Sequence, residues 1–135
     1  MKLEDAVTVA SHGMRVQGTR VQIAAQNLAN ADSLATTPGG DPYRRRTVSF
    51  REALDRDSGL HVVDIHRYGV DKAAFDKRLD PSHPAADAAG YVKLPNVEPL
   101  VELMDMREAQ RSYEANLKAM ALTRTMLSQT LNLLK

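Results

Sequence analysis

The sequence predicts a mainly α-helical fold in which long N- and C-terminal helices pair as an inner coiled coil, with a small antiparallel β and loop insert between them. Apolar residues recur every seven positions near both ends of the chain, which is the spacing of a coiled-coil seam. Between those ends, Gly, Pro, Asn and Asp residues separate short stretches of alternating side chains, as between strands. We therefore divide the chain into a helix over 1–31, an insert over 32–96 and a helix over 97–135.

The composition limits the classes of function. The chain has 135 residues, enough for one domain, and a net charge of only +1, so it has no general attraction for nucleic acid or anionic membranes. It contains no Cys, which excludes disulfides and thiolate sites. No stretch is apolar enough to span a bilayer, and the first residues lack the apolar segment of a cleaved secretory signal. We expect a soluble product whose export, if any, uses an uncleaved route.

The first helix is expected to carry little charge and to end near Asn30. Gly13 and Gly18 weaken it by about 1 kcal/mol each relative to Ala, and they allow a neighbouring helix to approach closely. Asn27 and Asn30 follow at its end, where Asn is typical of a helix stop. Because Asn27 lies one turn inside, the alternative is that both amides bond the returning helix or a neighbouring chain.

The insert contains two clear strand candidates, over 43–54 and 60–70, and a weaker one over 73–80. The proline-rich stretch 80–99 is expected to be an extended excursion. Three successive arginines begin the first candidate strand. They favour a protected edge strand, with ion pairing between subunits or a nucleic-acid patch as alternatives; only Tyr43 could stack on bases, and acids flank the run.

The C-terminal helix becomes apolar on nearly all sides over 119–134, where Arg124 is the only charge and the polar residues are Thr, Ser, Gln and Asn. Such a helix must be buried on all sides, and one partner helix with a small β unit cannot cover it. The segment is too short and too rich in hydroxyls and amides for a membrane span. Burial between copies of the chain is therefore the favoured interpretation.

The residues that could carry chemistry do not form a recognised site. His61 and His66 are an odd number of positions apart in a candidate strand, so they are expected to face opposite sides. His83 lacks ligand spacing, and His12 is alone on a helix. No nucleophile dyad or phosphate loop is present. We predict no catalytic residue, cofactor or metal, with a histidine-dependent metalloenzyme as the alternative that metal analysis would test.

Four co-linear stretches then carry a family resemblance: "AAQNLANADS", "TTPGGDPYRRR", "DPSHPAADAAGYVKLPNV" and "MREAQRSYEANLKAM". Together they resemble the rod and hook axial proteins of the bacterial flagellum, over residues 3–134, and among them a subunit of the proximal rod. The resemblance implies a structural, non-enzymatic subunit that polymerises by helix packing into a torque-transmitting shaft. A sibling rod or hook subunit is the near alternative, and a nucleic-acid adaptor using Arg44–Arg46 is a distant one.

The resemblance also implies partners and a location. The partners are other copies of the chain, other rod proteins, the rod-base adaptor, the MS ring and the flagellar type III export apparatus, with neither nucleic acid nor a small-molecule substrate. The location is the basal body, spanning the periplasm, reached without a cleaved signal peptide. Because a lone chain could not bury these helices, we expect the termini of the monomer to be largely disordered and to fold on assembly.

The residues expected at subunit contacts lie mostly on the apolar stripes of the two helices. They are Val7, Met14, Val21, Asn27, Leu28, Asn30, Met106, Tyr113, Leu117, Met120, Leu127, Leu131 and Leu134. The arginines Arg44, Arg45 and Arg46 are the candidates for ion pairs between subunits.

Overall fold

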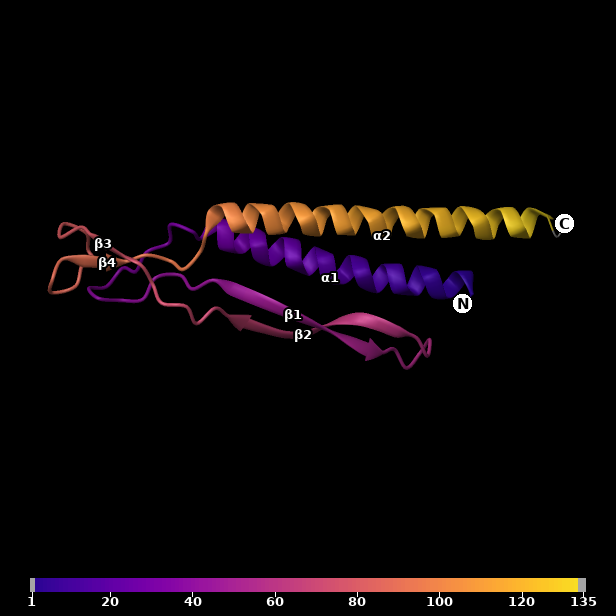
Figure 1. Cartoon of the computed structure of the whole chain (residues 1–135), viewed down its shortest axis with the longest axis horizontal. Helices are drawn as coiled ribbons and strands as arrows, with labels where there is room; N and C mark the ends of the chain where they lie inside the picture. The colour runs from indigo at the N-terminus through magenta and orange to yellow at the C-terminus, as the bar shows by residue number, and fades with distance from the viewer. Residues whose placement is uncertain (1, 134–135) are drawn as a thin grey trace.

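The computed structural model describes residues 2–133 and consists of two long terminal helices with a β-rich insert between them (Figure 1). The helices are α1 (Leu3–Ala29) and α2 (Pro99–Leu133), and the strands are β1 (Arg46–Leu54), β2 (His61–Val70), β3 (Lys77–Leu79) and β4 (Tyr91–Lys93). The predicted arrangement of terminal helices around an antiparallel insert is confirmed. The stripe residue Leu134 lies outside the described residues.

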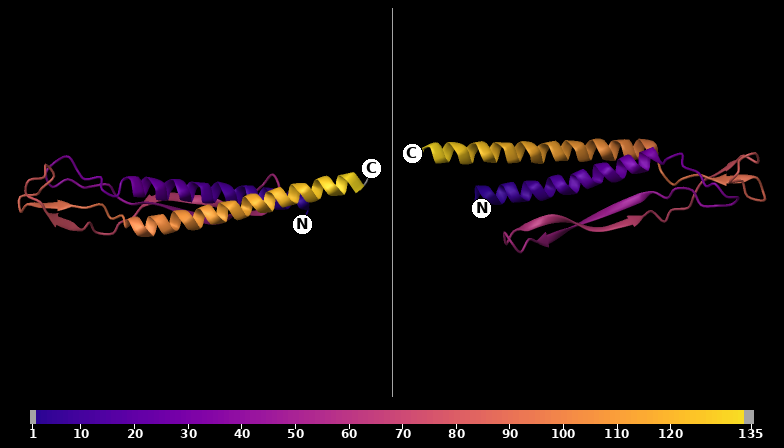
Figure 2. Two further views of the ribbon diagram at one scale, coloured as in Figure 1. Left: turned by 90° about the horizontal axis from the view of Figure 1, so that it is seen from above. Right: turned by 180° about the vertical axis from the view of Figure 1, so that it is seen from behind.

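The elements lie in layers, with α1 in the middle. Helix α2 packs on one side of α1 and the β1–β2 hairpin packs on the other, and the two helices run in opposite directions (Figures 1 and 2). The β3–β4 hairpin lies where α1 ends and α2 begins. Because α2 is covered along one side only, most of its surface is left to solvent.

The insert forms two separate two-stranded antiparallel sheets, β1–β2 and β3–β4. Strand β4 corrects the expectation that 80–99 is only an extended excursion. The loop before it closes because the Asp87 carboxylate accepts hydrogen bonds from the backbone N–H groups of Ala89 and Tyr91, both at 2.9 Å. Gly90 has a φ of 83°, a conformation that favours glycine. The chain therefore turns back and pairs with β3.

The β1–β2 hairpin contains a bulge that changes the prediction for the histidines. Ser49 pairs with Arg67 and Phe50 pairs with Ile65, so His66 is the extra residue. A bulge interrupts the alternation of side chains along a strand. The spacing of His61 and His66 therefore does not place them on opposite faces as predicted.

Both helix boundaries at the insert follow from local chemistry. Asn30 caps the end of α1: its backbone N–H and its side-chain Nδ2 both donate to the carbonyl of Gln26, at 3.1 and 2.9 Å. Ser33 Oγ then donates to Asn30 Oδ1 at 3.0 Å. Helix α2 begins at Pro99, which lacks only an N–H that would have no partner in a first turn. The helix-stop interpretation is thus confirmed for Asn30.

The core is small and made of small side chains. The buried apolar residues are Ala10, Val16, Ala24, Val62, Ala85, Val92 and Ala109. Three polar residues, Asn27, Glu102 and Thr123, are buried with them. Within residues 2–133, neither helix combines the length and hydropathy that a bilayer crossing requires.

Candidate assembly site

The closest contacts in the seam between α1 and α2 involve small and polar residues. A Cβ added at Gly13 would lie 2.8 Å from the Oδ1 atom of Asn116 on α2, which confirms the predicted close approach. Arg20 of α1 forms ion pairs with Asp105 and, at 3.3 Å, with Glu108. The hydrogen bond to Asp105 raises the pKa of Arg20, so the cation is held in place across the seam.

The buried side of α2 follows a repeat that the sequence analysis missed. Glu102, Ala109 and Thr123 are buried, and Asn116, which contacts Gly13, continues the same seven-residue spacing. This seven-residue spacing is present in the sequence. A search for apolar stripes does not detect it, because two of the four residues carry an amide or a carboxylate and none is large and apolar.

The predicted apolar stripes lie beside this seam and keep much of their surface open. None of the described stripe residues is fully buried: Tyr113 is 39% exposed, Leu117 49% and Leu131 62%. The remaining ones are half-buried, namely Val7, Met14, Val21, Leu28, Met106, Met120 and Leu127. The helix pair therefore leaves apolar side chains without a full intrachain partner, which is the arrangement that contact with another subunit requires.

The far end of α2 is the most open part of this surface. Gly13 faces Asn116 in the antiparallel pair, and α1 begins at Leu3, so about seven residues of α2, or roughly 10 Å, project beyond α1. Figure 1 shows this overhang. It ends on Leu133, which is 87% exposed.

At the opposite end of the helix pair, the Asn27 side chain ties three segments together. Its Nδ2 donates to the carbonyl of Arg46 at 2.9 Å and to Glu102 Oε2 at 3.1 Å. Its Oδ1 accepts from the Arg46 N–H at 2.8 Å and from the Tyr43 hydroxyl at 2.9 Å. Asn27 is fully buried, so its amide bonds the returning helix and the insert. These bonds realise the alternative in which the amide bonds the returning helix, and a contact of Asn27 with another chain stays a prediction.

Glu102 completes this group, which we call the junction cluster: Asn27, Tyr43, Arg45, Arg46 and Glu102. The Glu102 carboxylate is 1% exposed and accepts from Arg45 Nε as well as from Asn27. Burial raises the pKa of Tyr43, so its hydroxyl remains a neutral donor. A buried carboxylate needs hydrogen-bond partners. Those of Glu102 come from α1 and from the segment of the insert that precedes β1.

The arginine run is used mostly inside the chain. The Arg44 guanidinium lies 4.1 Å from the centre of the Phe75 ring and donates to the carbonyl of Asp71 at 2.9 Å. Arg45 binds Glu102. Both residues precede β1, so they are not on an edge strand. The ion pairs expected between subunits stay a prediction. Of the three arginines, Arg46 is the one whose side chain has no ion pair or hydrogen bond among residues 2–133; its backbone bonds Asn27.

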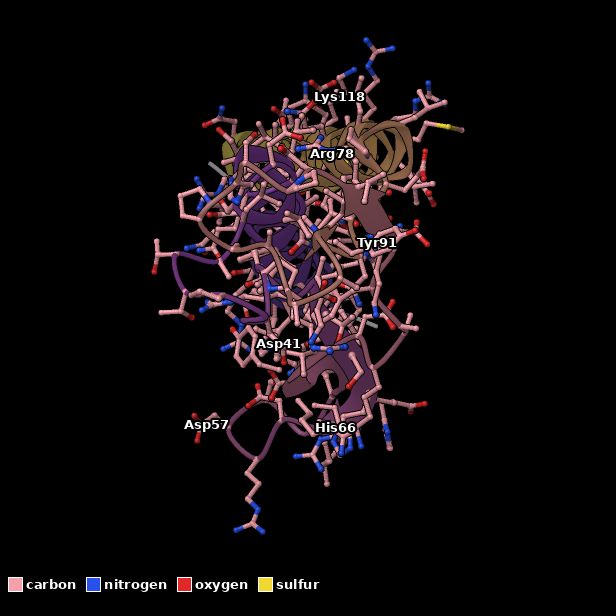
Figure 3. The ribbon with its side chains drawn as sticks, turned by 90° about the vertical axis from the view of Figure 1, so that its left-hand side faces the viewer. Asp41, Asp57, His66, Arg78, Tyr91 and Lys118 are labelled. Carbon is pink, nitrogen blue, oxygen red and sulfur yellow. The ribbon has the colours of Figure 1, made fainter. Side chains whose placement is uncertain are left out.

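The histidines are dispersed. His61 Nδ1 lies 2.7 Å from Glu52 Oε1 on the surface, and His83 Nδ1 accepts from the Ala85 N–H at 3.0 Å. Figure 3 shows His66 on the hairpin, on the side of the molecule remote from Lys118 of α2. Residues 2–133 contain no group of three or more potential metal ligands.

Comparisons with known proteins agree with this architecture. The family model described as flagellar basal body rod FlgEFG protein C-terminal matches residues 88–133, which include α2. The paired terminal helices and this match point to the class of protein, that of structural proteins of the flagellar basal-body rod.

The relatives identify the family within that class. The chain is 49% identical to the flagellar basal-body rod protein FlgC of Agrobacterium fabrum over 133 residues, which cover 98% of this chain and 96% of that protein. It is 37% identical to the FlgC protein of Aquifex aeolicus over 96% of both chains, and 36% identical to that of Salmonella typhimurium over 98% of both. The chain belongs to the FlgC family: it is a non-enzymatic, structural protein of the flagellar basal-body rod.

Proposed function

We propose that this subunit polymerises through the outer faces of its two helices, which form an inner coiled-coil layer of a torque-transmitting rod. One observation carries the proposal: the residues of α2 that are fully buried are small or polar, whereas the large apolar side chains of both helices, their leucines and methionines, keep part of their surface exposed. Burial of such side chains is the main favourable term in protein association. In this proposal 1–31 and 97–135 form the inner domain, and 32–96 forms the outer insert.

The partners in this proposal are other copies of the chain, other rod proteins, the rod-base adaptor and the MS ring. The rod spans the periplasm, and the subunit reaches it through the flagellar type III export apparatus without cleavage of a signal peptide. Membership of the family supports these assignments. Neither nucleic acid nor a small-molecule substrate has a role in them.

The difference between the two ends of the helix pair supports folding that is completed on assembly. The junction cluster holds the end of α1 and the start of α2 with buried hydrogen bonds. Within residues 2–133, the other end of the helix pair has no such cluster, and there α2 projects from the molecule. In the free subunit we therefore expect the first turns of α1 and the last turns of α2 to be disordered, which hydrogen exchange would detect as fast exchange confined to that end.

The experiment is a comparison of exposed leucines on different elements. In a strain that lacks the wild-type subunit, Leu117→Gln and Leu122→Gln in α2 should abolish rod assembly and swarming, since 49% and 63% of these side chains are exposed for contact. Leu54→Gln is the matched control, because Leu54 is 56% exposed but lies on β1. Circular dichroism of each purified variant checks that the fold is kept. Normal swarming of the α2 variants would contradict the proposal.

A further inference from the structure

A groove lies between the C-terminal half of α1 and the base of the β1–β2 hairpin, and we call it the α1–hairpin groove. Its volume is about 560 Å³. The side chains that give it its chemistry are Gln22, Ile23 and Gln26 of α1 with Arg46, Tyr68 and Val70 of the hairpin. The junction cluster uses only the backbone of Arg46 in its hydrogen bonds, so the Arg46 side chain is left to the groove.

The Arg46 guanidinium is the only charged group among the described residues that line this groove. Its side chain is exposed and has no ion pair within residues 2–133. Two acids, Glu102 and Asp105, line a neighbouring cavity together with Arg46. Both are already paired, with Arg45 and Arg20. Because a guanidinium stays charged at any physiological pH, a molecule that covers Arg46 must bring a negative group of its own.

The rest of the α1–hairpin groove suits an amphipathic helix. Tyr68 and Val70 are 59% and 51% exposed, and with Ile23 they form an apolar wall. Gln22 and Gln26 are four positions apart, so they lie on one face of α1 and form part of a ridge against which the side chains of another helix can pack. Their amides donate and accept hydrogen bonds. The fitting occupant is therefore a helix whose apolar face carries one carboxylate.

The exposed apolar end of this chain does not have that composition. Residues 119–133 contain neither Asp nor Glu, so this segment of a second copy would leave Arg46 without a partner. We propose that the α1–hairpin groove binds a helix of a different basal-body protein, which packs its apolar face on Tyr68 and Val70 and pairs an Asp or Glu with Arg46. The inference rests on the proposed function, in which other rod proteins are partners, and it names the surface and the chemistry of one such contact.

The first experiment reverses the charge in the groove. Arg46→Glu should abolish swarming, because it places a carboxylate against the carboxylate of the partner. Arg46→Gln should reduce swarming and Arg46→Lys should retain most of it. Arg56→Glu is the matched control, since Arg56 is an exposed arginine in the turn between β1 and β2, and it should swarm like the wild type. Circular dichroism and urea unfolding of the purified variants separate loss of the contact from loss of the fold, and Arg46→Gln remains the test if Arg46→Glu unfolds.

The second experiment identifies the partner by suppression of Arg46→Glu. The expected suppressor changes an Asp or Glu to Lys or Arg in a helix of another basal-body protein, and it should reduce swarming when Arg46 is restored. Because the chain contains no Cys, Val70→Cys is then combined with a cysteine at the suppressor position. Oxidised cells should contain one disulfide-linked heterodimer that disappears on reduction. Leu54→Cys, at the far end of the hairpin, is the control and should give none.

The outcomes separate this inference from the proposed function. Normal swarming of Arg46→Glu, suppressors confined to this chain, or crosslinks of Val70→Cys only between copies of this chain would overturn the binding of a different protein in the groove. Polymerisation through α2 stands in each of these cases if Leu117→Gln and Leu122→Gln lose swarming. The proposed function fails instead if those two leucine variants swarm normally.

Discussion

Replacement of Asn27 by Ala is expected to destabilise the subunit far more than replacement of Asn30 by Ala, although both residues are asparagines at the end of the same helix. Asn27 is fully buried and takes part in four hydrogen bonds of 2.8–3.1 Å. Truncation would leave the N–H and carbonyl of Arg46 without these partners and would remove one acceptor from Tyr43. Unsatisfied buried groups cost about 1–3 kcal/mol each.

The total loss for Asn27→Ala is about 3–5 kcal/mol, because Glu102 keeps Arg45 as a partner while the Arg46 backbone loses both of its bonds. Asn30 makes only local contacts, to Gln26 and Ser33, so Asn30→Ala should cost about 1 kcal/mol. A loss of 3–5 kcal/mol is a large part of the roughly 5–15 kcal/mol by which domains are stable.

The assay is urea unfolding of both purified variants, followed by circular dichroism, together with swarming of cells that carry them. Asn27→Asp adds a third comparison: it preserves size but places a second carboxylate beside Glu102, so it should be at least as damaging as Asn27→Ala. Equal losses for Asn27→Ala and Asn30→Ala would refute the reasoning, because they would show that the four buried bonds contribute no more than a cap.

Three further predictions concern the seam and the β3–β4 hairpin. In urea titrations, Gly13→Ala should gain less than the roughly 1 kcal/mol of helix propensity, because its Cβ meets Asn116, and adding Asn116→Ala should restore the gain; a full gain in the single variant would contradict the close approach. Arg20→Met should lower the unfolding free energy by about 1–3 kcal/mol, and an unchanged midpoint would show that its ion pairs do not hold the seam. The Tyr91 N–H lowers the pKa of Asp87 below 3.8, so this carboxylate stabilises the hairpin above its unfolded pKa, and that contribution is lost as pH falls through the folded pKa. The Tyr91 amide resonance should shift with pH as this carboxylate titrates, and Asp87→Asn should abolish that shift. A pH-dependent shift that persists in the variant would refute the assignment.

The sequence predicted those parts of the fold that depend on neighbours in the chain. Asn30 ends α1 as predicted, because capping acts within a few residues. The predicted start of α2, at 97, is two residues earlier than Pro99, because the prediction did not use the first-turn preference for proline. The β1–β2 hairpin followed from alternation. The β3–β4 pair did not, because its closure depends on the Asp87 carboxylate reaching two backbone N–H groups across a loop.

The junction cluster could not be predicted in the same way. Asn27 and Glu102 are 75 positions apart in the chain. Neither hydrophobic periodicity nor helix propensity indicates that an amide at the end of α1 bonds a carboxylate in the first turn of α2. The seven-residue apolar repeat was insufficient for a related reason. A seven-residue stripe of apolar residues predicts a seam, but it does not say whether the partner is the same chain or another copy.

The two ends of the helix pair therefore serve opposite requirements. At the junction cluster, buried polar groups are fully bonded inside the chain, and such groups favour one arrangement because any other leaves them unsatisfied. Along the rest of the pair, small residues such as Gly13 and Ala109 occupy the closest contacts, and they bury less apolar area than leucines would. Leu117 and Leu131 remain exposed, and under the proposed function their burial by another subunit would supply further hydrophobic free energy. Under the proposed function, the junction cluster sets the helix register before assembly, while the contacts that stabilise the distal turns are made in the rod.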